Sequence, residues 1–92
     1  MEDVFKALGD PVRVAIVDTL AARGDQSLFE LCARLIATND VTMSRQAVSK
    51  HLGVLESAGI VRMTRSGRTT LHSLEPGVLR DARDWLTTHI QQ

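Results

Sequence analysis

Residues 44–59 constrain the fold of this chain most, because they predict one short helix with two chemically different faces. Ser44 is suited to cap the start of this helix, and Gly59 suits the left-handed conformation just past its end. The apolar side chains between them recur at helical spacing and form a stripe that a core would bury. These side chains are Val48, Leu52 and Leu55, helped by Ala47 and Ala58.

The opposite face of this helix is polar and basic. It carries Arg45, Gln46, Ser49, Lys50 and Gly53, with no acidic side chain among them. Arg and Gln make bidentate contacts with guanine and adenine edges, and Ser and Lys suit phosphates or bases. A polar helix face is more often simply solvated, so this stretch alone leaves both interpretations open.

A basic β-hairpin is expected directly after this helix. Residues 60–65 and 68–74 have the composition of two strands, and the Ser-Gly pair at 66–67 predicts a two-residue loop with a cheap positive φ. The expected cations of the hairpin are Arg62, Arg65 and Arg68, the last two beside the tip. A basic hairpin next to a basic helix face is the helix-plus-wing arrangement, which favours a major-groove DNA reader.

The distribution of charge supports this interpretation, although the formal net charge is zero. Residues 1–40 carry a net charge of −3, residues 41–74 carry +4, and residues 75–92 carry −1. The basic excess therefore falls on the expected helix and hairpin, as it does in nucleic-acid interfaces. A winged-helix module that binds proteins instead of DNA should lack basic residues on both elements, and this chain has them on both.

Two short helices are expected at the start of the chain. Residues 2–8 are apolar on one side, and Gly9 ends their helix. A second helix runs from Pro11 to about Arg23 with Asp10 as its cap, because the missing N–H of proline costs nothing at the first helical position. Its expected buried stripe is Val12, Ala15, Ile16, Thr19 and Leu20.

A third helix should begin at Ser27, which matches a capping box with Glu30. It would be the first helix of a helix-turn-helix and bury Leu28, Leu31, Cys32, Leu35 and Ile36. Residues 37–43 then form a connection longer than is usual in this motif. They either extend the third helix or make a wider turn that shifts the next helix, and the wider turn is our prediction.

The last helix, residues 76–90, carries an apolar stripe too wide for one small domain to cover. Ninety-two residues form a single domain, 1–92, with a limited core. The stripe could pack on its own chain, but we expect it to form a homodimer interface together with residues 2–8. The expected interface residues are Val4, Phe5, Leu8, Leu79, Ala82, Trp85, Leu86, His89 and Ile90.

In order, these segments resemble the ArsR/SmtB family of winged helix-turn-helix repressors over nearly the whole chain. Residues 5–13 (FKALGDPVR) are similar to the family's opening ALxDPxR segment, and residues 45–52 (RQAVSKHL) and 55–61 (LESAGIV) to its recognition helix. The wing (RSGR) and a last helix with Trp85-Leu86 complete the match. The resemblance implies an α+β, mostly α-helical fold of five helices and a two-stranded wing, in a dimer that binds operator DNA. Many family members release DNA on binding a metal or another inducer.

The metal sites of the family are not intact in this sequence. Some members pair cysteines in the third helix in a pattern like ELCVCDL, whereas here Arg34 replaces the second cysteine. Others place D-x-H and H-x-x-E pairs on the last helix, and neither Asp81 nor His89 has the partner at that spacing. We therefore expect no metal and no cofactor, with Cys32 as a small core residue. A metal- or redox-responsive repressor that uses Cys32 is the alternative.

The expected partners are double-stranded operator DNA and a second copy of the chain. No enzyme is expected, because Ser49 and His51 point to different sides of their helix and no acid completes a triad. No signal peptide or membrane span is expected, and a single cysteine fits a reducing cytoplasm. His51 would touch a phosphate or pack against the wing. The expected DNA-binding residues are Ser44, Arg45, Gln46, Ser49, Lys50, His51, Arg62, Arg65 and Arg68; the sequence names no operator and no inducer.

Overall fold

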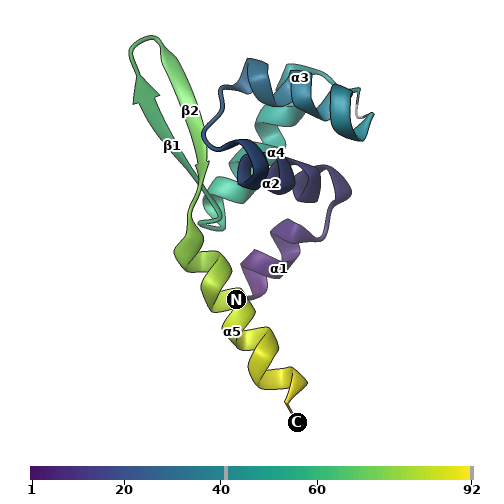
Figure 1. The fold of residues 1–92 in the computed structure, drawn as a ribbon, viewed down its shortest axis with the longest axis vertical. Helices are drawn as coiled ribbons and strands as arrows, with labels where there is room; N and C mark the ends of the chain where they lie inside the picture. The colour runs from purple at the N-terminus through teal and green to yellow at the C-terminus, as the bar shows by residue number, and fades with distance from the viewer. Residues whose placement is uncertain (41, 92) are drawn as a thin grey trace.

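The computed structural model describes residues 1–40 and 42–91, so Val41, in the predicted wider turn, and Gln92 lie outside the described residues. Within those ranges the elements are α1 (Glu2–Leu8), α2 (Pro11–Arg23), α3 (Leu28–Asn39), α4 (Arg45–Ser57), β1 (Val61–Ser66), β2 (Thr69–Leu74) and α5 (Pro76–Ile90) (Figure 1). The predicted winged helix fold, mostly helical with one antiparallel hairpin, is confirmed. None of these helices is long and apolar enough to cross a membrane.

Side-chain caps set the starts of three helices at the predicted residues. Asp10 accepts hydrogen bonds from two backbone amides in the first turn of α2, at 2.8 and 3.2 Å. Ser27 and Glu30 form the capping box of α3, and the hydrogen bond from the Ser27 amide lowers the pKa of the Glu30 carboxyl. Ser44 accepts from an amide of α4 at 3.1 Å. The orphan amides at each of these helix starts therefore find partners.

The connection between α3 and α4 is shorter than predicted, because α3 continues to Asn39. Our prediction of a wider turn is wrong for residues 37–39. The Thr38 hydroxyl donates to the carbonyl of Arg34 at 2.7 Å, which suits a helical position. Asp40 then ends the helix in the left-handed conformation, with φ of 53°. Asp tolerates that conformation better than most residues, so the chain stops α3 without a glycine.

The core lies between α2, α3 and α4, and α1, β1 and the start of α5 close its edges. In the predicted stripe of α4, Val48, Leu52 and Leu55 are buried, whereas the two alanines are half-buried. Ile16, Leu31 and Leu35 from α2 and α3 are buried as well. Ile36 is 52% exposed, contrary to the prediction. It lies about 100° further round the helix than Leu35, beyond the face that meets α2 and α4.

The hairpin pairs Val61 with Leu74 and Ser66 with Thr69, so its two-residue loop is Gly67-Arg68 and not the predicted 66–67. Gly67 has φ of 61°, and glycine at the first loop position is the requirement of a type II′ turn. The predicted loop, 66–67, and the observed loop, 67–68, both contain Gly67, so the preference for glycine in a turn fits either one. The observed strand β1 has the predicted length but is shifted by one residue, ending at Ser66, which puts Arg68 in the tip itself.

α5 leaves the body of the molecule at an end opposite the tip of the hairpin (Figure 1). Its first half packs on the core through Val78, Leu79 and the buried Ala82. Further along, the Trp85 ring lies 5.1 Å from the Phe5 ring of α1, measured between centroids. The terminal helices α1 and α5 therefore meet, while the C-terminal half of α5 extends beyond the core.

Candidate nucleic-acid interface

The exposed face of α4 presents the predicted polar and basic side chains together. Val48, Leu52 and Leu55 fill the core, which turns the opposite side of the helix outward. That outward side carries Arg45, Gln46, Ser49 and Lys50, all exposed. Because these positions are one helical turn apart or adjacent, they form a continuous surface at the N-terminal half of α4.

Arg45 is oriented by an aromatic ring that the sequence analysis missed. Its guanidinium carbon lies 5.6 Å from the centroid of the Phe29 ring, in the geometry of a cation–π contact. Phe29 is 67% exposed, in the first turn of α3. The sequence did contain a signal for this contact. Phe29 is an aromatic residue between Ser27 and Glu30, on the polar side of the expected helix, where the core would not bury it.

The cations of the hairpin divide into two groups. Arg68 occupies the exposed tip, and the Arg65 Nε donates to the carbonyl of Gly67 at 3.3 Å, so both lie at the loop. Arg62, in contrast, forms an ion pair with Glu75 at 2.7 Å where the hairpin joins α5. The structure therefore separates Arg62 from the other predicted DNA-binding cations and neutralises it locally.

His51 lies beside α1 and α2 rather than against the hairpin. Its Nδ1 is 3.2 Å from an Nη of Arg13, whose guanidinium also donates to the carbonyls of Ala7 at 2.6 Å and Lys6 at 3.5 Å. A guanidinium only donates, so Nδ1 of a neutral His51 is the acceptor. Arg13, another residue that we did not predict, thus joins the last turn of α1 to α4.

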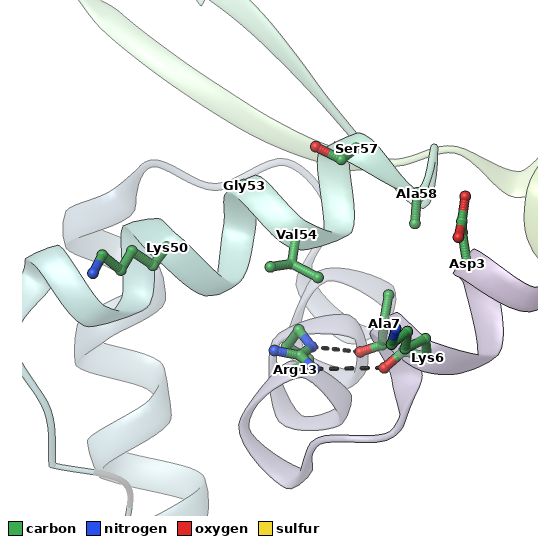
Figure 2. Close-up of a pocket in the computed structure, with 9 residues that line it drawn as sticks. All are labelled: Asp3, Lys6, Ala7, Arg13, Lys50, Gly53, Val54, Ser57 and Ala58. Carbon is green, nitrogen blue, oxygen red and sulfur yellow. Dashed lines mark hydrogen bonds between the residues drawn. The ribbon is translucent and has the colours of Figure 1, made fainter.

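An open groove of about 720 Å³ runs along α4 on the side of α1 (Figure 2). Its lining includes three basic side chains, and the acidic Asp3 lies at the end near Ala58. A second hollow, of about 420 Å³, lies on the other side of α4, between that helix, the start of α3 and the hairpin. The proposed DNA-reading face of α4 is therefore flanked by a depression on each side.

His72 lines the second hollow, and only 5% of its surface is exposed. Its backbone pairs with Gln26 in an isolated β-bridge that ties β2 to the loop before α3. Burial lowers the pKa of the His72 imidazole, and the negative charge of Glu56 offsets part of that effect. The folded chain therefore binds a proton at His72 less readily than a freely exposed histidine would.

Comparison with known proteins places this surface in a family. A family model described as a helix-turn-helix domain matches residues 8–64. The chain is 49% identical over 65 residues to the uncharacterized HTH-type transcriptional regulator YuzN of Bacillus subtilis, covering 71% of each chain. It is 30% identical to the transcriptional repressor SdpR of the same organism over 92 residues, 100% of this chain and 94% of that one.

The solved structures that superpose on this chain also include transcriptional regulators. An ArsR-like transcriptional regulator from Rhodococcus superposes with a TM-score of 0.78 at 32% identity, covering 98% of this chain and 79% of that one. The chain belongs to the ArsR/SmtB family. The homodimeric winged helix-turn-helix DNA-binding domain of a possible ArsR-family regulator from Mycobacterium bovis superposes with a TM-score of 0.71 at 25% identity, covering 99% and 79% of the two chains. This ArsR/SmtB protein is thus a winged-helix transcriptional regulator.

The side chains that we assigned to an ArsR/SmtB-type dimer interface differ in their accessibility. Val4 and Ala82 are buried within one chain, at 7% and 5% exposure, so neither is available to a partner as predicted. Helical periodicity marked them as apolar but could not show that their own core covers them. Phe5, Leu8 and Leu79 are half-buried, whereas Trp85, Leu86, His89 and Ile90 are exposed on α5. The His89 ring stacks on Trp85 at 3.9 Å.

Potential metal ligands do not cluster in the part of the chain that the structure describes. Among residues 1–40 and 42–91, no three His, Cys, Asp or Glu side chains lie close enough to hold a metal ion. Cys32 is half-buried beside the core of α3, and its thiol is free. Its surroundings are those of a packed apolar side chain.

Proposed function

We propose that this chain is a homodimeric repressor that binds an inverted-repeat operator with α4 in the major groove. The observation that carries the proposal is the continuous exposed surface of Arg45, Gln46, Ser49 and Lys50 beside a hairpin with Arg68 at its tip. A major groove about 12 Å wide admits one α-helix, and these residue types match base edges and phosphates.

The residues of α4 have different proposed tasks. Arg45 and Gln46 lie at the N-terminal end, the part of a recognition helix that contacts base edges. Ser49 and Lys50 follow one turn later and reach bases or phosphates, and Ser44 caps the helix start. The contact with Phe29 already restricts the Arg45 side chain in the free protein. Arg45 therefore loses less conformational freedom when it binds DNA.

The hairpin has a proposed task that does not depend on base sequence. Arg68 at the tip, with Arg65 beside it, would contact the phosphate backbone or the minor groove next to the helix. Arg62 and His51 are not included among the proposed contacts, because Arg62 is paired with Glu75 and His51 with Arg13.

The proposed dimer forms through α5, with α1 beside it. Trp85, Leu86 and Ile90 leave an apolar surface at the far end of α5 that the protomer does not cover. The related domain from Mycobacterium bovis is a homodimer, which supports the same arrangement here. A two-fold dimer requires an inverted repeat whose half-site centres lie about one helical turn, or a multiple of it, apart.

Repression is proposed to work without the family metal sites. The second thiolate of the third-helix site is absent, since Arg34 occupies its position, and Cys32 packs against the core. Cys32 is the single cysteine of this sequence, so it has no second thiol in the chain with which to form a disulfide, and a redox role is not favoured.

Selection of bound duplexes from a random DNA pool tests the proposal. We expect enrichment of an inverted repeat, and the same repeat when zinc, cadmium or arsenite is added. A protein-interaction module would enrich no sequence, and that result would refute DNA reading by this chain. A repeat that is enriched only without metal would instead support a metal-responsive repressor.

A further inference from the structure

We infer that the groove between α1 and α4 seats the DNA backbone, and that Lys6 of α1 is a phosphate contact. The inference rests on the proposed function, because it extends the proposed interface from α4 and the hairpin to the first helix. The sequence analysis assigned α1 only to dimerisation.

The groove is continuous with the proposed reading face of α4. Lys50, Gly53, Val54 and Ser57 form one of its walls, and Lys50 belongs to both surfaces. Asp3, Lys6 and Ala7 of α1 form the opposite wall, with Arg13 at its base (Figure 2). When a helix lies in a major groove, the two sugar-phosphate backbones pass on its two sides. The groove beside α1 therefore lies where one of these backbones would run.

The charges of the groove fit a chain of phosphates. Lys6 and Lys50 are exposed, and within the described residues no hydrogen bond or ion pair occupies either ammonium group. A lysine ammonium binds phosphate as a point charge and needs no fixed geometry. The Arg13 guanidinium adds a third positive charge at the base. Asp3 is the one acidic side chain in the lining and opposes an anion at the end near Ala58.

The structure also holds the backbone of Lys6 in place. Arg13 donates to the carbonyls of both Lys6 and Ala7, and it contacts His51 of α4. These bonds fix the last turn of α1 against the helix that reads DNA. Since the Phe5 ring of the same helix packs on Trp85 of α5, α1 connects the proposed dimer surface with the proposed DNA surface. DNA in this groove would therefore be sensitive to how the two protomers are docked.

The test compares Lys6→Gln and Asp3→Asn with a control, Arg80→Gln, which removes an exposed cation on α5 outside the groove. Binding of fluorescent duplexes is followed by anisotropy from 50 to 300 mM salt. One duplex carries the selected repeat and the other has the same bases scrambled. One phosphate contact per protomer predicts that Lys6→Gln lowers the salt slope by about two per dimer, equivalent to roughly 30-fold in affinity at 0.15 M salt. The loss should be similar on both duplexes, and Asp3→Asn should tighten both.

Each result decides between the claims. If the unmutated protein prefers the selected repeat and Lys6→Gln behaves like Arg80→Gln, the groove does not hold DNA and only this inference is wrong. If the unmutated protein binds neither duplex at 50 mM salt, the proposed function fails and this inference with it. Unfolding midpoints of the variants, which should match that of the unmutated protein because these side chains are exposed, exclude misfolding as the cause.

Discussion

Gly59 sits at a junction where an added methyl group should be costly. It follows α4 with φ of 78°, and a Cβ built at this position would lie 3.2 Å from Cγ2 of Val78 at the start of α5. An L-residue in the left-handed region costs roughly 1–2 kcal/mol per residue. The close contact adds to that cost unless Val78 moves. We therefore expect Gly59→Ala to lower the free energy of unfolding by about 1–2 kcal/mol or more.

Gly53 is the matched control, because the same chemical change there should have the opposite sign. It lies inside α4, and an added Cβ would have no heavy atom within 4 Å. Replacing an interior helical glycine with alanine gains roughly 0.5–1 kcal/mol. The two variants should therefore differ by about 1.5–3 kcal/mol, since the loss at one site and the gain at the other add in the comparison.

Thermal and urea unfolding followed by circular dichroism measure this difference. One kcal/mol shifts the midpoint by about 4–8 °C in a domain of this size, so Gly59→Ala should melt well below Gly53→Ala. All samples need the same protein concentration, because the stability of a dimer depends on it. A Gly59→Ala protein as stable as the unmutated one would show that this junction is not left-handed or that α5 moves freely away from it.

Three further predictions address the dimer, the cysteine and the wing. Leu86→Arg should convert the dimer to a monomer in sedimentation velocity, because an unpaired charge buried at an interface costs several kcal/mol; an unmutated protein that is monomeric at micromolar concentration would contradict the dimer itself. Cys32→Ala should leave DNA binding and its response to zinc, cadmium and arsenite unchanged, whereas loss of a stoichiometric metal site in this variant would show that Cys32 is a ligand. Because burial lowers the pKa of His72, the folded chain binds its proton less readily than the unfolded chain, so stability is full above pH about 6.5 and falls as the pH drops below that value. Urea unfolding at pH 7.5 and 5.5 should show a smaller loss in His72→Leu than in the unmutated protein, and equal losses would refute this cause.

Local sequence chemistry predicted most of the fold. Asp10, Ser27 and Ser44 each cap the helix that they were expected to cap, because capping depends on a side chain and amides only two or three residues away. The hairpin loop was misplaced by one residue, since 66–67 and 67–68 both contain Gly67 and local preference does not separate them. Pairing of Val61 with Leu74 at the core end sets the observed register.

Contacts between residues distant in the sequence escaped prediction. Arg13 and His51 are 38 positions apart, and Arg62 and Glu75 are 13 apart, so no periodic pattern indicated either pair. The same limit explains the error at Ala82, which was assigned to a partner surface although its own chain buries it. Periodicity identifies an apolar face, but it does not identify what covers that face.

The most direct test of the central claim, that the exposed face of α4 reads DNA, is a set of salt titrations on the selected repeat and its scrambled counterpart. Gln46→Ala and Arg45→Ala should each cost roughly 1–3 kcal/mol on the repeat and relax preference at particular base pairs. Arg68→Ala should weaken both duplexes by similar factors and lower the salt slope by about two per dimer. If the Arg45 and Gln46 variants weaken both duplexes equally, α4 does not read bases through these side chains, and the account of this interface is wrong.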